Sequence, residues 1–282
     1  MDRISTPETL MTAKKRFPKY RLHKPRNRAV VTIDGRDIYL GTYESKKSYK
    51  RYDRLIAEWL VGGRHLPDDS ETATDPNATT VADIAAAYWC MAEDMYQGSG
   101  ELTCIRHAMR PLVHLYGDLP AAEFSPRKLK AIRNHVIWHG APDPKKGRPK
   151  RRDRPLSRKT VNDYIGRIKR AFAWAAEEEK MPGEVSAALQ AVKNLRRGRS
   201  AALEPKTVEP IPHEDVWAVL PHVSQQVAAM IQIQFWTGMR AGEVVIMRTG
   251  DLDMSDDVWT YVPRQHKTQH LGHIRHVDIG PK

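Results

Sequence analysis

An apolar stretch that ends at a glycine constrains the C-terminal part of this chain more than any other feature. Residues 227–235 have the composition of a largely apolar helix, and Gly238 follows shortly after them. Glycine readily adopts the left-handed conformation that ends helices. The pattern therefore predicts that one helix ends at Gly238 and that a second one begins near Arg240. We expect this second helix to bury Val244, Val245 and Met247.

The first turn of that second helix carries the charged residues Arg240 and Glu243. An arginine fixed by a glycine turn above a packed helix is well placed to bind a phosphate through its planar guanidinium. Glu243, three residues on, could orient that guanidinium. The alternative is an ordinary pair of helices whose charges are solvated.

The order Thr237-Gly238-x-Arg240-x-x-Glu243, followed by an apolar run and Asp251, resembles the first active-site motif of the tyrosine recombinases, the phage-type integrases. Residues 258–262 and 274–279 alternate like two strands, and His266, Lys267 and Thr268 fall in the turn between them. In the family a lysine sits in such a turn, and Lys267 matches it.

The resemblance implies site-specific DNA recombination or integration without a metal or other cofactor. A tyrosine attacks the scissile phosphate and leaves a 3′-phosphotyrosine, while arginines neutralise the negative charge of the transition state. A lysine donates a proton to the leaving 5′-oxygen. By resemblance, Arg240 is the first catalytic arginine, Glu243 supports it and Lys267 is the acid.

The remaining family residues, a His-x-x-Arg motif and the nucleophilic tyrosine, are expected downstream of Lys267. Only fifteen residues follow Lys267, and none of them is a tyrosine. We therefore expect the chain to stop within the catalytic domain and to be catalytically incomplete. His107 and Arg110 spell His-x-x-Arg upstream, where a coincidence on a helix surface explains them. Tyr261 lies in a predicted strand, where packing is the expected role.

Positive charge is clustered along the chain. The whole sequence carries a formal charge of +12, whereas residues 1–66 hold 16 basic and 7 acidic residues and residues 127–159 hold 13 and 2. Such clustering favours a polyanion as partner, and nucleic acid is the commonest one. A soluble basic protein without such a partner is the alternative.

The N-terminal region reads as a small three-stranded sheet packed on one helix. Residues 20–23, 29–33 and 36–40 have strand patterns, Asp34-Gly35 is a strong hairpin signal, and Ser45 is placed to cap a helix. This region resembles the arm-binding domain of integrases, whose sheet enters the major groove of DNA. The resemblance makes five residues candidate DNA contacts, although each could be a solvated charge: Arg21, Lys24, Arg26, Arg28 and Arg36.

The middle region reads as four helices, over about 80–96, 101–116 and 126–139 and from Ser157 onward, with a basic Pro-rich insertion before the last. It resembles the core-binding domain of the family, which clamps one side of the DNA. The insertion either touches DNA or is a flexible solubilising loop. The last helix adds candidate DNA contacts: Arg158, Lys159, Arg167, Lys169 and Arg170.

The domain boundaries follow from these patterns. We expect a multidomain, mainly α chain with a disordered tail at 1–18, an arm-type domain at 19–62, a linker at 63–79, a core-binding domain at 80–193 with its insertion at 140–156, a linker at 194–210 and a partial α+β catalytic domain at 211–282. The first linker is polar and acidic, so it would let the arm-type domain move independently. The second is basic and would cross the DNA backbone.

Other sequence features limit the alternatives. Cys90 and Cys104 make no disulfide or metal pattern, and no apolar run reaches transmembrane length, so we expect a cytoplasmic protein without a membrane partner. Four histidines, at 266, 270, 273 and 276, straddle a turn without a familiar zinc spacing, so no metal site is predicted.

Two hypotheses remain for the function. The first is a tyrosine recombinase of a mobile element that binds double-stranded DNA and self-associates on it when full-length. The second is a non-catalytic DNA-binding protein that occupies recombination sites.

Overall fold

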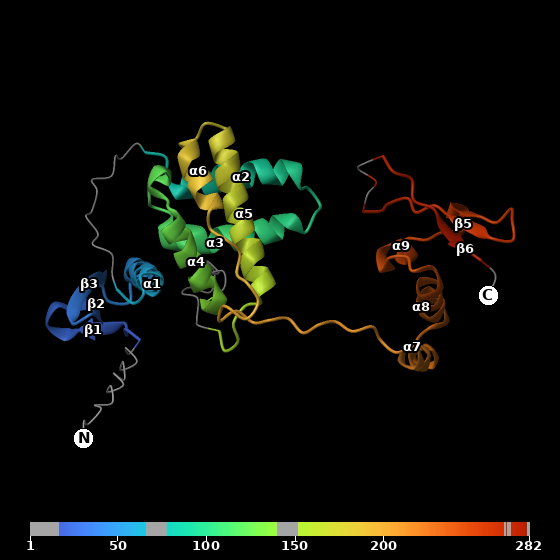
Figure 1. Cartoon of the computed structure of the whole chain (residues 1–282), viewed down its shortest axis with the longest axis horizontal. Coiled ribbons are helices and arrows are strands. Elements are labelled where there is room, and N and C mark those ends of the chain that lie inside the picture. The colour runs from blue at the N-terminus through green and yellow to red at the C-terminus, as the bar shows by residue number, and fades with distance from the viewer. Residues whose placement is uncertain (1–16, 66–77, 140–151, 268, 270–271, 281–282) are drawn as a thin grey trace, which may run out of the picture. The chain divides into compact units, whose positions relative to one another are not determined.

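The computed structural model describes residues 17–65, 78–139, 152–267, 269 and 272–280. The chain divides into two compact units, Met1–Lys206 and Thr207–Lys282. It is mainly helical, with a small three-stranded antiparallel sheet near each end (Figure 1), which confirms the predicted fold class at this level. Most of the expected tail, first linker and basic insertion fall outside the described residues. No helix in the described part combines the length and apolar composition needed to cross a bilayer.

The N-terminal sheet has the strand order β1-β2-β3, with bounds Arg21–His23, Arg28–Ile33 and Arg36–Thr42. A short 3₁₀ turn, Lys24–Arg26, joins the first two strands. Ile33 pairs with Arg36 across the predicted two-residue turn, where Asp34 and Gly35 have φ of 50° and 79°. Positive φ at both positions is typical of hairpin turns that match the twist of the strands. The predicted hairpin is confirmed.

Helix α1, Lys46–Val61, follows the sheet and begins at the predicted cap. The Ser45 side chain accepts a hydrogen bond from the Ser48 N–H, which satisfies one of the free donors of the first turn. Three side chains of α1 pack with Ala29, Val31, Ile33 and Leu40 of the sheet, namely Tyr52, Ile56 and Trp59. This small core ties the helix to one face of the sheet.

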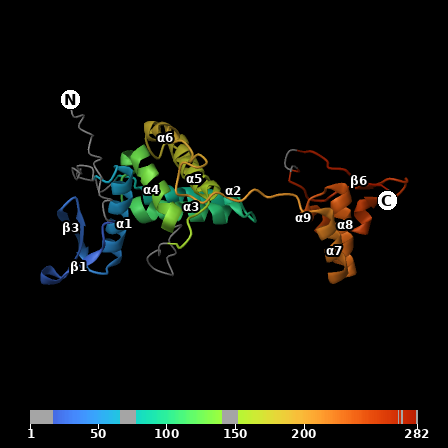
Figure 2. The ribbon, with the colours of Figure 1, turned by 60° about the horizontal axis from the view of Figure 1, so that its bottom comes forward.

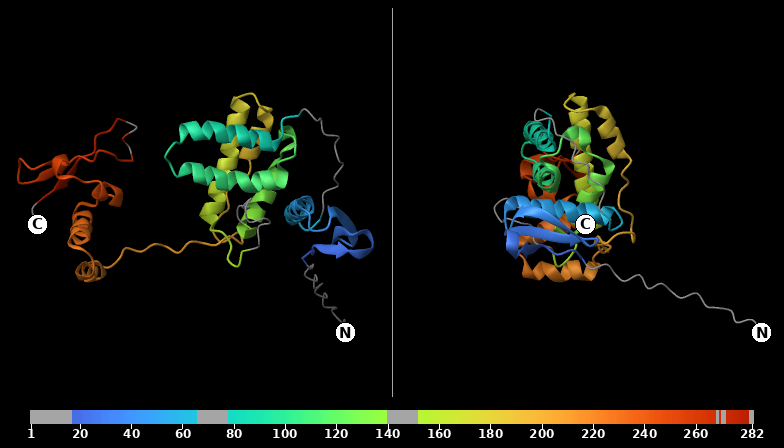
Figure 3. Two further views of the ribbon diagram at one scale, coloured as in Figure 1. Left: turned by 180° about the vertical axis from the view of Figure 1, so that it is seen from behind. Right: turned by 90° about the vertical axis from the view of Figure 1, so that its left-hand side faces the viewer.

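The helical part of the first unit contains α2 to α6, with bounds Val81–Met95, Glu101–Tyr116, Pro126–His139, Arg158–Glu177 and Gly183–Gln190. α2 and α3 lie side by side, and α5 packs against both of them (Figure 3). Thr80 and Asp83 form a capping box at the start of α2. The first four helices were predicted, whereas α6 was not.

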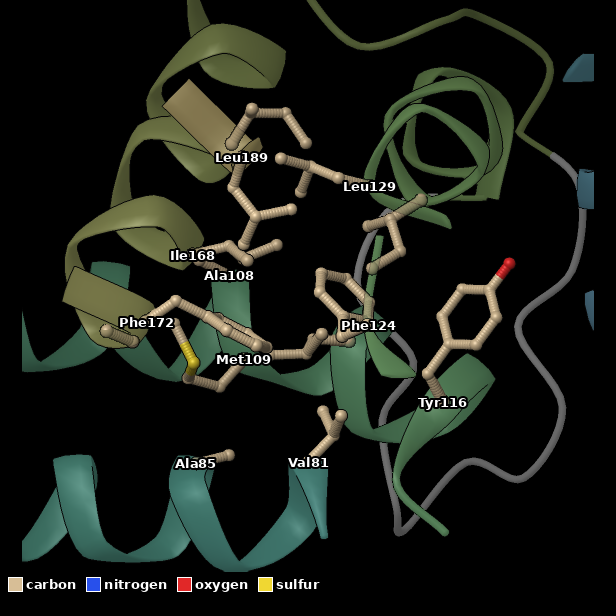
Figure 4. Close-up of a cluster of buried hydrophobic side chains, with 14 of the residues drawn as sticks. Val81, Ala85, Ala108, Met109, Tyr116, Phe124, Leu129, Ile168, Phe172 and Leu189 are labelled. Atoms are coloured by element: carbon tan, nitrogen blue, oxygen red, sulfur yellow. The ribbon is translucent and has the colours of Figure 1, made fainter. Parts of the chain in front are cut away.

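The core of this bundle is aromatic and aliphatic. Phe172 of α5 stacks on Phe124 at 4.7 Å between ring centroids, and Met109, Leu129 and Leu189 surround them (Figure 4). All five side chains are buried. Leu189 comes from α6, so this helix completes the core.

Helix α1 also packs against α3 and α4, on the side that faces away from its sheet (Figure 2). The buried Asp53 carboxylate lies 3.1 Å from His114 Nε2 of α3, and Ala57 is part of the bundle core. Lys50 forms an ion pair with Asp118. The expectation that residues 19–62 move independently did not anticipate these contacts, which join the N-terminal module to the bundle in one unit.

The second unit contains α7, α8 and α9, with bounds His213–Val219, Gln225–Thr237 and Ala241–Val245. Its antiparallel sheet has the order β4-β5-β6, with bounds Leu252–Asp253, Trp259–Tyr261 and Val277–Ile279. Val244 is buried as predicted and Met247 packs against the core, but Val245 is 67% exposed, so that part of the prediction was wrong. With only five residues, α9 turns just one side toward the core.

Candidate functional site

The turn between α8 and α9 is fixed by its own backbone and by Thr237. Gly238 has φ of 64°, and its N–H donates to the Gln234 carbonyl at 2.9 Å, which ends α8 as predicted. The Thr237 hydroxyl donates to the Ile233 carbonyl at 2.6 Å and accepts from the Met239 N–H at 3.3 Å. Met239 is buried behind the turn. The chain therefore enters α9 at Arg240 in a defined direction.

Glu243 is the organising group of this site. Its side chain is 3% exposed, and its two oxygens accept from the Arg240 backbone N–H at 3.0 Å and from Arg240 Nη1 at 2.9 Å. Burial acts to raise the pKa of Glu243, but these hydrogen bonds and the charge of Arg275 outweigh it and hold the pKa below its ordinary value. These contacts favour the charged form of Glu243 and fix the orientation of the Arg240 guanidinium.

A second arginine that the sequence analysis did not single out reaches the same carboxylate. Arg275 Nε lies 3.1 Å from Glu243 Oε1, as an ion pair whose N–H is not aligned for a hydrogen bond. The Arg240 side chain is 55% exposed and the Arg275 side chain 33% exposed. Both side chains thus remain partly exposed while they share one buried anion. We call Arg240 and Arg275 the paired guanidiniums.

The alternation of side chains along a strand could have pointed to Arg275 as a residue that faces the core. Val277 of β6 pairs with Tyr261 of β5 and faces the core, and Ile279 packs against the same core. The predicted strand 274–279 is longer than β6, which begins at Val277, but counting back by two along the predicted strand reaches Arg275, because side chains on one face of a strand recur at every second residue. A charged side chain with this parity requires a buried partner of opposite charge. The alternation of residues 274–279 could therefore have indicated an ion pair.

Tyr261 contacts the site from the core, and the charge of Asp251 acts on Tyr261. The Tyr261 side chain is fully buried, and its hydroxyl donates to the Glu243 backbone carbonyl at 2.8 Å. Burial, followed by the charges of Asp251 and Glu243, raises the pKa of Tyr261. Asp251, the acidic residue of the motif, accepts from Arg264 Nε at 2.6 Å. Packing is thus the role of Tyr261, as expected from its strand.

Lys267 lies between β5 and β6, in the connection where the sequence placed it. Its side chain is exposed, and within the described residues it forms no hydrogen bond or ion pair with the paired guanidiniums or with Glu243. Thr268 and His270 fall outside those residues. Among the residues that are described, no group of three or more His, Cys, Asp or Glu is arranged to hold a metal ion.

The cations of the N-terminal sheet differ in how they are held. Arg21 bonds to Asp37 at 2.8 Å and to Thr32 at 2.6 Å, and Arg26 stacks over the Tyr39 ring at 5.3 Å. The other three candidates, Lys24, Arg28 and Arg36, are exposed and form no ion pair within the described part of the chain. Within the described residues, four of these cations therefore have no paired carboxylate: Lys24, Arg26, Arg28 and Arg36.

Most of the candidate cations of α5 are engaged within the first unit. Arg158 donates to both Glu204 oxygens, at 2.9 and 3.1 Å. Arg167 and Arg170 both pair with Glu101 at 2.6 Å. Lys169 donates to the Val192 carbonyl, and among the five candidates only Lys159 is exposed without an ion pair in the described residues. A structural role accounts for the other four.

The His-x-x-Arg sequence at His107 and Arg110 lies on α3, in the first unit, whereas Arg240 belongs to the second. Burial, together with the charges of Arg110 and Arg106, lowers the pKa of His107. Arg106 itself stacks over the Trp89 ring at 4.7 Å. These contacts describe a packed helix surface.

Comparisons with known proteins add no relative whose site could be compared with this one. No model of a protein family matches the chain, and no curated protein sequence matches it.

Proposed function

We propose that this chain binds duplex DNA and belongs to a tyrosine recombinase, with the paired guanidiniums holding the phosphate at which strands are cut and rejoined. The observation that carries the proposal is the buried Glu243 carboxylate between Arg240 and Arg275. Two adjacent guanidiniums match the charge of a phosphate and of the more negative transition state. Lys267 would act as the proton donor, as the family resemblance implies.

The test is duplex binding by the 1–282 chain over a range of salt concentrations, using a labelled pool of random duplexes because the target sequence is unknown. We expect Arg240→Ala to cost about 1.5–3 kcal/mol of binding free energy, which is about tenfold or more in affinity. The salt slope should fall by about 0.9, because one phosphate contact is lost.

Arg248→Ala is the matched control. Arg248 is exposed in the same unit and forms no bond to Glu243 in the described structure, so the variant removes the same charge from outside the site. Equal effects of the two variants on affinity and slope would show that Arg240 contributes only diffuse charge.

The second hypothesis, a DNA-binding protein without strand cleavage, is favoured by one observation. Tyr261, the tyrosine that contacts this site, is buried and its hydroxyl is bonded to the Glu243 carbonyl, so it cannot reach a phosphate. A nucleophile held in line with the phosphate is required for attack.

We therefore expect the 1–282 chain alone to give no covalent adduct on a nicked suicide duplex. Denaturing electrophoresis detects such an adduct. A phosphotyrosine linkage mapped to any residue of this chain would contradict the expectation and establish a complete enzyme.

A further inference from the structure

The carboxylate of Asp251 is buried where the chain passes from α9 into the second sheet. Asp251 ends the 3₁₀ turn Thr249–Asp251, and its N–H donates to the Arg248 carbonyl at 3.0 Å. The side chain is 6% exposed, and its Oδ2 is buried without a hydrogen-bond partner among the described residues. A buried carboxylate is costly unless it is paired, so a side chain that pairs with Asp251 is strongly held there.

That side chain is Arg264, on the segment that leaves β5. Arg264 Nε donates to Asp251 Oδ1 at 2.6 Å. The Arg264 side chain is 56% exposed, so packing does little to fix it. The ion pair with Asp251 therefore determines where Arg264 lies.

The backbone before Arg264 is held as well. The Val262 N–H donates to the Asp251 carbonyl at 3.2 Å, so the main chain and the side chain of one residue hold both Val262 and Arg264. Pro263 lies between them and is buried, and its ring restricts φ to about −65°. Few backbone rotations remain free between β5 and Arg264.

The same strand is joined to the helix that carries Arg240. The Tyr261 hydroxyl of β5 donates to the Glu243 carbonyl of α9 at 2.8 Å. Leu252, the neighbour of Asp251, pairs with Tyr261 in the sheet. The position of β5 is therefore defined relative to α9.

Lys267 follows Arg264 by three residues in the connection between β5 and β6. Three residues span at most about 11 Å of extended chain. Holding Arg264 in place therefore limits the region in which Lys267 can lie, although the Lys267 side chain is exposed.

We propose that Asp251 is a positioning residue that fixes, through Arg264, the place of Lys267 relative to Arg240. The proposal rests on the function proposed above, in which Arg240 holds the phosphate and Lys267 donates a proton. A proton donor is effective only within hydrogen-bond reach of the atom that receives the proton. Asp251 acts on Lys267 through the backbone between them.

Pulsed electron paramagnetic resonance on the full chain tests this proposal without DNA. Cys90→Ser and Cys104→Ser first remove the native thiols. Gln225→Cys and Lys267→Cys then carry two spin labels, one of them at the exposed start of α8. A second labelled pair, Gln225→Cys with Val245→Cys, reports on α8 and α9 alone, because Val245 is 67% exposed on α9.

We expect Asp251→Ala to broaden the 225–267 distance distribution and to shift its maximum, while the 225–245 distribution keeps its position and width. Arg264→Gln should cause the same change. Arg264→Lys keeps a cation for the buried carboxylate and should restore a narrower distribution. Asp257→Ala is the matched control and should change neither distribution, because Asp257 is exposed and forms no ion pair within the described residues.

The outcomes are decisive in either direction. An unchanged 225–267 distribution in a folded Asp251→Ala or Arg264→Gln variant would overturn the proposal. Equal broadening of both distributions would also overturn it, because Asp251 would then support the whole unit. If Asp251→Ala does not fold, Arg264→Gln decides, because it alters a largely exposed side chain. A wild-type chain that binds no duplex overturns the proposed function, whereas the two distances still decide whether Asp251 positions residue 267.

Discussion

At the scale of single residues, the charge of Glu243 determines where two guanidiniums point. Its folded-state pKa is depressed, so its contribution to stability is full above the unfolded pKa of about 4.3 and is lost as the pH falls through the folded value. We predict that Glu243→Gln lowers the unfolding free energy by about 1–3 kcal/mol at neutral pH. The variant should also be less sensitive to acid. Urea unfolding at pH 7 and at about pH 3.5 measures both effects.

Glu209→Gln removes an exposed carboxylate of the same unit and serves as the control. If the two variants show the same stability at both pH values, the ion pairs of Glu243 contribute nothing to the fold, and its role is confined to orienting Arg240.

At the scale of elements, α1 has two packed sides with different chemistry. Tyr52, Ile56 and Trp59 bind the sheet, whereas Asp53 and Ala57 meet the bundle. We predict that Asp53→Ala costs about 1–3 kcal/mol, because it leaves the His114 partner of a buried contact unsatisfied. Lys50→Ala should cost less than about 1 kcal/mol, because Asp118 is exposed in that ion pair.

Chemical denaturation of the two single variants tests this prediction on one helix. The same contacts predict that a fragment starting near Thr80 folds with reduced stability, because the α1-facing surface of α3 and α4 is uncovered. Equal denaturation midpoints for the bundle in that fragment and in the 1–206 unit would show that α1 contributes nothing to the stability of the bundle.

Local signals explain which elements could be predicted. Gly238, Ser45 and the Thr80 capping box act within a few residues, so the sequence alone indicates the helix ends they form. Helix α6 has eight residues, no side-chain cap and one buried side chain, Leu189, so no local pattern marks it.

Contacts between distant segments were less accessible to prediction. The side of α1 that meets the bundle carries Asp53 and Ala57, and such a polar and small pair does not indicate a packing surface in the sequence. The partner of Arg275 lies more than thirty residues away in the sequence. The family motif indicated Arg240 and Glu243 because their contact is local. Arg275 precedes β6, and only the folded chain shows that its partner is Glu243.

At the scale of the whole molecule, the two units differ in how much they bury. In the described part of Thr207–Lys282 the buried hydrophobic residues are Met239, Val244, Tyr261 and Val277, while Trp236 is 60% and Ile274 is 73% exposed. We predict that a 207–282 fragment unfolds with low cooperativity and binds a hydrophobic dye such as ANS, because so small a core offsets little conformational entropy. Calorimetry and dye fluorescence measure this, with the 1–206 fragment as the cooperative comparison.

A sharp, cooperative calorimetric transition of the 207–282 fragment without dye binding would contradict this prediction. It would show that the small core around Tyr261 suffices for a stable domain.

The hydrogen bonds that tie Leu203 to the start of α5 also have a mechanical consequence. Leu203 pairs with Leu156 and Arg158 in a parallel bridge, and Glu204 adds an ion pair at the next residue. A pulling force applied to the first unit at its C-terminal end therefore loads the bonds at Leu203 and Glu204 before it loads residues 196–199 or α6. The bonds at Leu203 and Glu204 would have to break before a pull could unravel the bundle from its C-terminal side.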